Sequence, residues 1–277
     1  MIKLTRPALK VAASTKLQQY QTIVDNHVGF PAKVDFAKED FPQKNVIGNA
    51  TFDDVKEKLI AMCSGAERCH YCEDSKADEV EHLLPKDVYP DLCYQWNNYF
   101  YSCGPCNTKK SNKCAVIDTV TGKRLNNQPP KKRKNGPPLP PRTPPIAGQQ
   151  AFINLETEDP LQFFFLDLTN GSFEFSEFPN PNTVDFEKAA FTLEALKLNK
   201  RAFLRKARKQ AYGDYKARLT EYIFQRNNGV HLTQTNKLIA ELQAHSHPTV
   251  WKEMVRQKDF IPELQVLFNQ APEALSW

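Results

Sequence analysis

The sequence of 277 residues contains no run of about eighteen apolar residues, so a helical membrane span is excluded. Its start, Met1 to Arg6, lacks the apolar stretch of a secretory signal peptide. We therefore expect a cytoplasmic protein whose thiols stay reduced. No internal repeat and no long heptad pattern is present, which argues against solenoids and extended coiled coils. The length instead suits one large domain or two small ones.

Neither sign of charge dominates, but the basic residues are unevenly distributed. Lysine and arginine number 37 against 32 acidic residues, which gives a formal net charge of +5. Residues 119–155 hold seven basic residues and no acid, and residues 200–218 hold eight against one acid. Such concentration predicts an anionic polymer, nucleic acid, as partner; the alternative is a basic linker and a solvated helix face. The side chains expected at this interface are Lys131, Lys132, Arg133, Lys134, Arg205, Arg208 and Lys209.

Cysteine occurs seven times, and this odd number argues against a framework of disulfides. Four of the seven form two C-x-x-C pairs, Cys69 with Cys72 and Cys103 with Cys106. Two such pairs can supply a tetrahedral shell of four thiolates, which structural zinc prefers. The alternative, two unrelated redox motifs, lacks the βαβ pattern that surrounds such motifs in thioredoxin-like proteins. We therefore predict a structural Zn²⁺ ion with no open coordination position.

Helical periodicity is clearest in the C-terminal third of the chain. Helices are predicted at 184–198, 200–226, 233–244, 248–257 and 262–269, and nearer the start at 14–25 and from Thr51 to Ser64-Gly65. Eight prolines within residues 125–147 predict an extended linker. The Asn170-Gly171 pair between two apolar runs predicts a β-hairpin.

These elements predict an α+β protein that is mostly helical. We expect an N-terminal helical region over residues 1–64 and a core with both cysteine pairs over 65–118. A basic, proline-rich linker over 119–150 would connect this core to a hairpin and helical region over 151–277.

The chain between and just after the cysteine pairs carries an ordered set of polar motifs. It reads Glu81-His82-Leu83-Leu84-Pro85, then Trp96-Asn97-Asn98-Tyr99, and Cys106 is followed by Asn107 and Lys110. This order resembles the HNH endonuclease family in its zinc-supported form, whose fold is a ββα-metal core. The resemblance covers about residues 67–113.

The resemblance implies a role for each of these residues. His82 would be the general base that activates water, and Asn98 would fix the catalytic loop. Glu81 and Asn107 would hold a catalytic Mg²⁺ or Mn²⁺ ion, and Lys110 would contact a phosphate oxygen. The chain departs from the usual pattern in having Glu81 for an aspartate and Asn107 where histidine is common. Asparagine at the last position favours Mg²⁺ or Mn²⁺ over zinc in the catalytic site.

Each of these residues also has a purely structural interpretation. His82 would then be a hydrogen-bonded core histidine, and Glu81 a surface acid. Asn98 would stabilise a turn, Asn107 would cap the following helix, and Lys110 would be a solvated lysine.

Two further segments resemble one bacterial subgroup of this family. Residues 154–175 and 191–208 are similar to segments that follow the HNH core in the retron- and Septu-associated anti-phage nucleases. That resemblance implies an ABC/SMC-like ATPase partner that controls or delivers the nuclease. The first 50 residues and the terminal helices are then the candidates for docking.

We accordingly expect a metal-dependent endonuclease that acts on nucleic acid, with DNA favoured. The alternatives are a stand-alone restriction or mobile-element HNH endonuclease, an RNA- or tRNA-cleaving nuclease, and a catalytically dead, zinc-stabilised binding or scaffold module. Residues 64–114 hold six basic and eight acidic residues, so this segment is not expected to bind a polyanion by itself. No helix-turn-helix is evident, which predicts weak sequence specificity.

Overall fold

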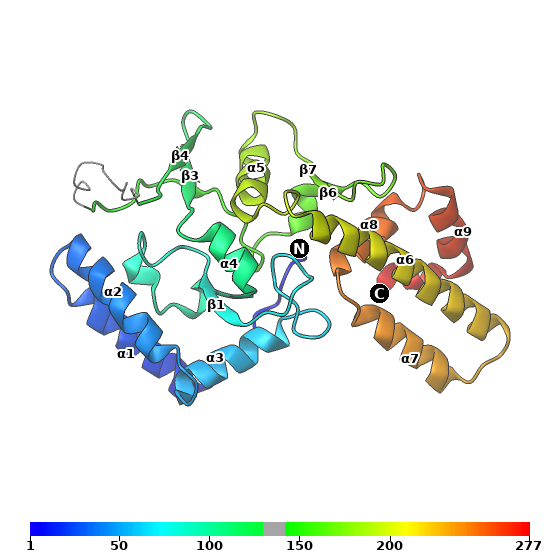
Figure 1. The fold of residues 1–277 in the computed structure, drawn as a ribbon, viewed down its shortest axis with the longest axis horizontal. Coiled ribbons are helices and arrows are strands. Elements are labelled where there is room, and N and C mark those ends of the chain that lie inside the picture. Colours follow the sequence, from blue (N-terminus) through cyan, green and yellow to red (C-terminus); the bar gives the residue numbers. More distant parts are fainter. Residues whose placement is uncertain (130–141) are drawn as a thin grey trace.

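A computed structural model describes residues 1–129 and 142–277 and shows an elongated α+β protein, about half of it helical. Helices α1 to α3 lie at one end and helices α6 to α9 at the other, with the short strands between them (Figure 1). In the part of the chain that the structure describes, no helix is both long and apolar enough to cross a membrane.

The N-terminal helices are α1 (Val11–Asp25), α2 (Phe30–Lys44) and α3 (Ala50–Ala61). The sequence predicted α1 and α3 but not α2, which contains two prolines. Pro31 lies in the first turn, where its missing N–H costs nothing, and Pro42 lies near the end. Asn49 caps α3 by accepting the backbone N–H of Thr51, so the helix begins one residue before its predicted start at Thr51.

A short hairpin and a helix form the centre of the predicted core. Strand β1 (Glu79–His82) pairs antiparallel with β2 (Tyr99–Ser102), with His82 opposite Tyr99, and helix α4 (Gly104–Lys110) follows. The long connection between the strands contains two 3-10 turns, η1 (Pro90–Leu92) and η2 (Trp96–Asn98). The chain therefore runs strand, strand, helix, with both cysteine pairs at the ends of the hairpin.

A small sheet includes two short strands from the stretch predicted as a linker. Strand β3 (Ala115–Ile117) pairs with β4 (Arg124–Asn126) on one side and with β5 (Gln149–Gln150) on the other. Strands β4 and β5 thus lie within the range 119–150 that was predicted as a basic, proline-rich linker, and backbone hydrogen bonds hold them against β3.

The C-terminal region follows the sequence prediction closely. After a 3-10 turn, η3 (Pro160–Gln162), strands β6 (Phe164–Leu166) and β7 (Phe175–Glu177) form the predicted hairpin. Leu166 pairs with Phe175, so the loop is longer than the Asn170-Gly171 turn alone. The helices are α5 (Val184–Leu196), α6 (Ala202–Asn227), α7 (Leu232–Gln243), α8 (Pro248–Gln257) and α9 (Pro262–Gln270), and a 3-10 turn, η4 (Pro272–Ser276), follows them.

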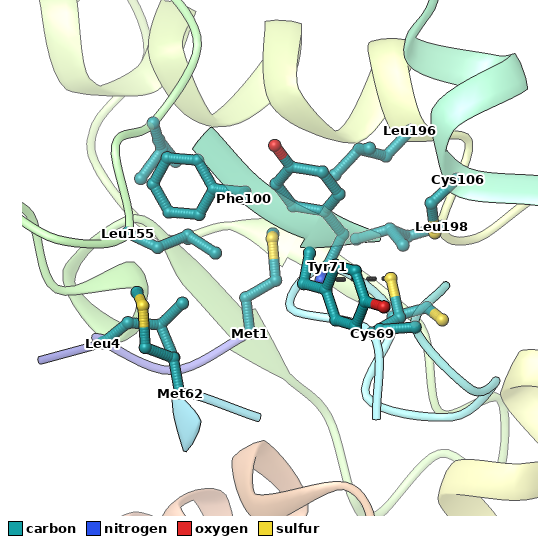
Figure 2. Close-up of a cluster of buried hydrophobic side chains, with 14 of the residues drawn as sticks. Met1, Leu4, Met62, Cys69, Tyr71, Phe100, Cys106, Leu155, Leu196 and Leu198 are labelled. Atoms are coloured by element: carbon teal, nitrogen blue, oxygen red, sulfur yellow. Dashed lines mark hydrogen bonds between the residues drawn. The ribbon is translucent and has the colours of Figure 1, made fainter. Parts of the chain in front are cut away.

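One hydrophobic core extends from the N-terminal segment to the last helices. Figure 2 shows Met1 and Leu4 among side chains from distant parts of the sequence, including Tyr71, Leu155 and Leu198. The first residues thus pack between the cysteine-rich core and the C-terminal region. Their side chains connect these two parts of the protein.

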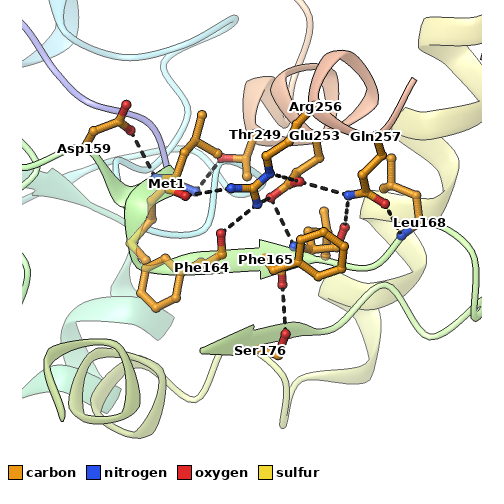
Figure 3. A network of polar contacts seen from close by, with 12 residues as sticks. Met1, Asp159, Phe164, Phe165, Leu168, Ser176, Thr249, Glu253, Arg256 and Gln257 are labelled. Atoms are coloured by element: carbon orange, nitrogen blue, oxygen red, sulfur yellow. Dashed lines mark hydrogen bonds and ion pairs between the residues drawn. The ribbon is translucent and has the colours of Figure 1, made fainter. Parts of the chain in front are cut away.

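Side chains of helix α8 form hydrogen bonds with backbone groups of β6 and of the turn before it (Figure 3). Glu253 accepts the N–H of Leu166, and Gln257 donates to the carbonyl of the same residue. Arg256 donates to the carbonyls of Leu161 and Phe164. These contacts place polar side chains where a further strand would otherwise pair.

Candidate active site

Four cysteine sulfurs meet where the chain enters and leaves the β1–β2 hairpin. Cys69 and Cys72 precede β1, Cys103 precedes α4, and Cys106 lies in its first turn. All four are buried with their sulfurs within 4.8 Å of one another, and the sulfurs of Cys72 and Cys103 are 3.8 Å apart. Zinc–sulfur bonds of about 2.3 Å in a tetrahedron require sulfurs about 3.8 Å apart, so the cluster fits a structural zinc ion.

A polar cavity of about 320 Å³ lies beside this hairpin and helix. Three of the predicted catalytic and metal-binding residues, Glu81, His82 and Asn107, line it. The other lining residues are Phe41, Val80, Pro85, Lys86, Thr108, Ser111 and Asn112. Asn98 and Lys110 are buried and bond to residues of the hairpin and its loop, rather than forming the wall.

His82, the last residue of β1, is buried between the aromatic rings of Phe41 and Tyr99, whose centroids are 4.5 and 5.2 Å from its own. Its Nε2 lies 2.9 Å from the carbonyl oxygen of Cys93. A carbonyl can only accept, so Nε2 carries the hydrogen and Nδ1 of the neutral ring keeps its lone pair. Burial, assisted by the charge of Lys86, lowers the pKa of His82 to about 3. The ring is therefore neutral near pH 7.

Asn98 holds the loop that follows His82. Its Oδ1 accepts the N–H of Leu84 at 2.8 Å, and its Nδ2 donates to the carbonyls of Leu84 and Leu92 at 3.0 and 2.9 Å. All three side-chain hydrogen bonds go to backbone groups, so Asn98 orders the connection between the strands without lining the cavity.

Glu81 and Lys110 form a buried ion pair. The Glu81 Oε1 accepts from the Lys110 ammonium at 2.6 Å, and Oε2 accepts from the Tyr71 hydroxyl at 2.7 Å. Lys110 is fully buried and donates also to the carbonyl of His82, so its ammonium meets these groups rather than a phosphate. Burial raises the pKa of Glu81 although Lys110 opposes this shift. Each carboxylate oxygen keeps a further lone pair, and Glu81 lines the cavity, so the residue fits an oxygen ligand.

Asn107 lies within α4, whose cap position belongs to Cys103, so Asn107 is not the helix cap. Its Nδ2 donates to the carboxylate of Glu79. Within residues 1–129 and 142–277 its Oδ1 has no hydrogen-bond partner, and the residue lines the cavity. This amide oxygen and Glu81 are hard donors of the kind that Mg²⁺ and Mn²⁺ accept.

Only three of the seven predicted nucleic-acid contacts fall in the part of the chain that the structure describes. Lys131, Lys132, Arg133 and Lys134 lie outside the described residues. In α6, Lys209 is exposed, and Arg205 forms an ion pair with Glu174. Arg208 is only 2% exposed and donates to two backbone carbonyls. This corrects the expectation for Arg208, which is a core residue because it lies on the packed face of α6.

Three residues of the site were missed from the sequence. Tyr71 lies inside the first cysteine pair and bonds Glu81, and Lys86 directly follows Pro85 and lines the cavity. Tyr71 and Lys86 both lie within the segment that carries the motifs, so their positions in the sequence could have identified them as candidates. Phe41 comes from α2, a helix that was not predicted, and no local pattern marks it.

Comparison with known proteins gives a partial similarity. The chain matches no family model and no solved structure. It is 43% identical over 68 residues to Septu protein PtuB of Bacillus thuringiensis. The matched segment is 23% of this chain and covers only about a quarter, 26%, of the length of that relative. The similarity to a Septu protein therefore concerns one segment rather than the whole chain.

Proposed function

We propose that the chain is a metal-dependent HNH endonuclease that hydrolyses phosphodiester bonds, with DNA as the favoured substrate. The observation that carries this proposal is the neutral, oriented ring of His82 on the wall of a polar cavity that Glu81 and Asn107 also line. These side chains come from an antiparallel hairpin and the helix after it, an order like that of a ββα-metal core.

In this proposal His82 acts as the general base. Its Nδ1 takes a proton from the attacking water, while the Cys93 carbonyl holds the proton on Nε2. The Tyr99 hydroxyl donates to the same carbonyl and fixes its position. Asn98 is a positioning residue, because it orders the loop that carries this carbonyl. The four-cysteine cluster holds zinc and fixes both ends of the hairpin.

Glu81 and Asn107 hold the divalent cation in this proposal. When bound, Mg²⁺ or Mn²⁺ supplies positive charge that stabilises the charge developing on the phosphate. Lys110 and Tyr71 keep the Glu81 carboxylate in place, and Glu79 orients the amide of Asn107. Lys110 is thereby a positioning residue rather than a phosphate contact.

The similarity to Septu protein PtuB supports a role in anti-phage defence. In that role an ABC/SMC-like ATPase would control or deliver the nuclease. A stand-alone nuclease and an RNA substrate remain the alternatives that experiment must separate.

The test is cleavage of plasmid DNA, single-stranded DNA and RNA with Mg²⁺, Mn²⁺ or EDTA, with and without the ATPase. We expect cleavage that EDTA abolishes and that Asn107→Ala shifts to higher metal concentration. Lys109→Ala, an exposed position on the same helix, is the matched control and should behave as wild type. Absence of cleavage under every condition, with zinc still bound, would instead support a zinc-stabilised scaffold.

A further inference from the structure

Lys86 is the basic residue among those that line the cavity. It is half-buried, and its ammonium lies 5.3 Å from the centroid of the Phe41 ring. The His82 ring packs against the same Phe41 ring, and both His82 and Lys86 line the cavity. The effect of Lys86 on the pKa of both Glu81 and His82 agrees with this closeness.

The carboxylates around Lys86 are already bonded to other groups. Glu81 accepts from Lys110 and Tyr71, as described above. Asp87, the next residue, pairs with Lys38 at 2.9 Å and accepts from Asn112 at 2.8 Å. Across residues 1–129 and 142–277, no carboxylate lies within ion-pair distance of Lys86. Its charge is therefore available to an anion that enters the cavity.

We propose that Lys86 binds the phosphate of the nucleic acid beside His82. This inference rests on the proposed nuclease function and assigns to Lys86 the contact that the sequence suggested for the buried Lys110. An ammonium binds a phosphate oxygen as a point charge and reads no base, so the contact gives affinity without sequence specificity. The surrounding segment is poor in positive charge, so the loss of this one cation should be measurable.

The experiment measures binding of a fluorescein-labelled DNA duplex and single strand by anisotropy, without divalent cations, over a range of salt concentrations. The proteins are wild type, Lys86→Gln, Lys86→Arg and the control Lys76→Gln, which removes an exposed lysine outside the cavity. Thermal unfolding of each variant verifies that it is folded. Metal-dependent cleavage by wild type is measured in parallel.

We expect Lys86→Gln to bind several-fold more weakly at low salt and to lower the salt-dependence slope by about one. Lys86→Arg should retain most of the affinity, and Lys76→Gln should match wild type. If Lys86→Gln keeps the wild-type affinity and slope, or if wild type does not bind, the inference is wrong. If the effect of Lys86→Gln is seen but wild type cleaves nothing with either metal, both with and without the ATPase, the phosphate contact stands and the proposed nuclease function fails.

Discussion

At the scale of single residues, burial decides what each polar side chain contacts. Lys110 lies one helical turn beyond Asn107, a spacing that suggested a phosphate contact. Helix α4 packs on β1, so Lys110 faces inward and pairs with Glu81. The sequence identified the residue types and their order, but the direction of each side chain depends on packing between elements. Lys86 was missed for the same reason, because the sequence does not show that its side chain lines the cavity.

Asn98→Ala should destabilise the protein by about 2–4 kcal/mol. The substitution leaves the N–H and carbonyl of Leu84 and the carbonyl of Leu92 without their side-chain partner, and unsatisfied buried groups are costly. Urea unfolding followed by circular dichroism measures the change. The neighbouring Asn97 is exposed, so Asn97→Ala is the control and should change stability by less than about 0.5 kcal/mol. Equal effects of the two variants would contradict the positioning role of Asn98.

At the scale of elements, local periodicity predicted most helices but not their partners. Helices α5 to α9 lie within a few residues of the predicted ranges, since each has a continuous apolar face or a clear start. Helix α2 was missed because it contains two prolines, and proline is a poor helix former. Phe41, on the buried face of this helix, contacts the ring of His82. The β4–β3–β5 sheet was missed because its strands are short and one of its pairings bridges residues far apart in sequence.

The start of α6 contacts the four-cysteine cluster, and this contact should affect zinc retention. Arg201 immediately precedes α6 and donates from Nη2 to the sulfur of Cys106 at 3.2 Å. A hydrogen bond to a thiolate contributes about 1.5 kcal/mol, so Arg201→Ala should release zinc about tenfold faster. Competition with a chromogenic chelator measures the rate. Arg205→Ala, one turn further along and paired at the surface with Glu174, is the control and should release zinc at the wild-type rate. Equal release from Arg201→Ala and wild type would show that the contact does not hold zinc.

At the scale of the whole molecule, the continuous core joins regions that the sequence divides. Residues 65–118 and 151–277 read as separate regions because the basic, proline-rich stretch separates them. The N-terminal segment packs between them, and its role in the core is invisible in a local pattern.

Because the core is shared, the protein should unfold in one transition. In the Trp96→Phe variant, fluorescence reports only Trp251 and Trp277 in the C-terminal region, whereas zinc release reports the hairpin. Both signals should show the same urea midpoint, as cooperative unfolding requires. Two separated midpoints would show that the regions fold independently.

The central claim is that the cavity around His82 is a hydrolytic centre. Its most direct test is the single-turnover cleavage rate of wild type and His82→Ala, on the polymer and metal that support cleavage, with zinc content and unfolding midpoint measured for both. Loss of a general base should lower the rate by at least about 100-fold while zinc stays bound. A His82→Ala rate within about twofold of wild type would contradict the assignment, since general-base catalysis contributes far more than that.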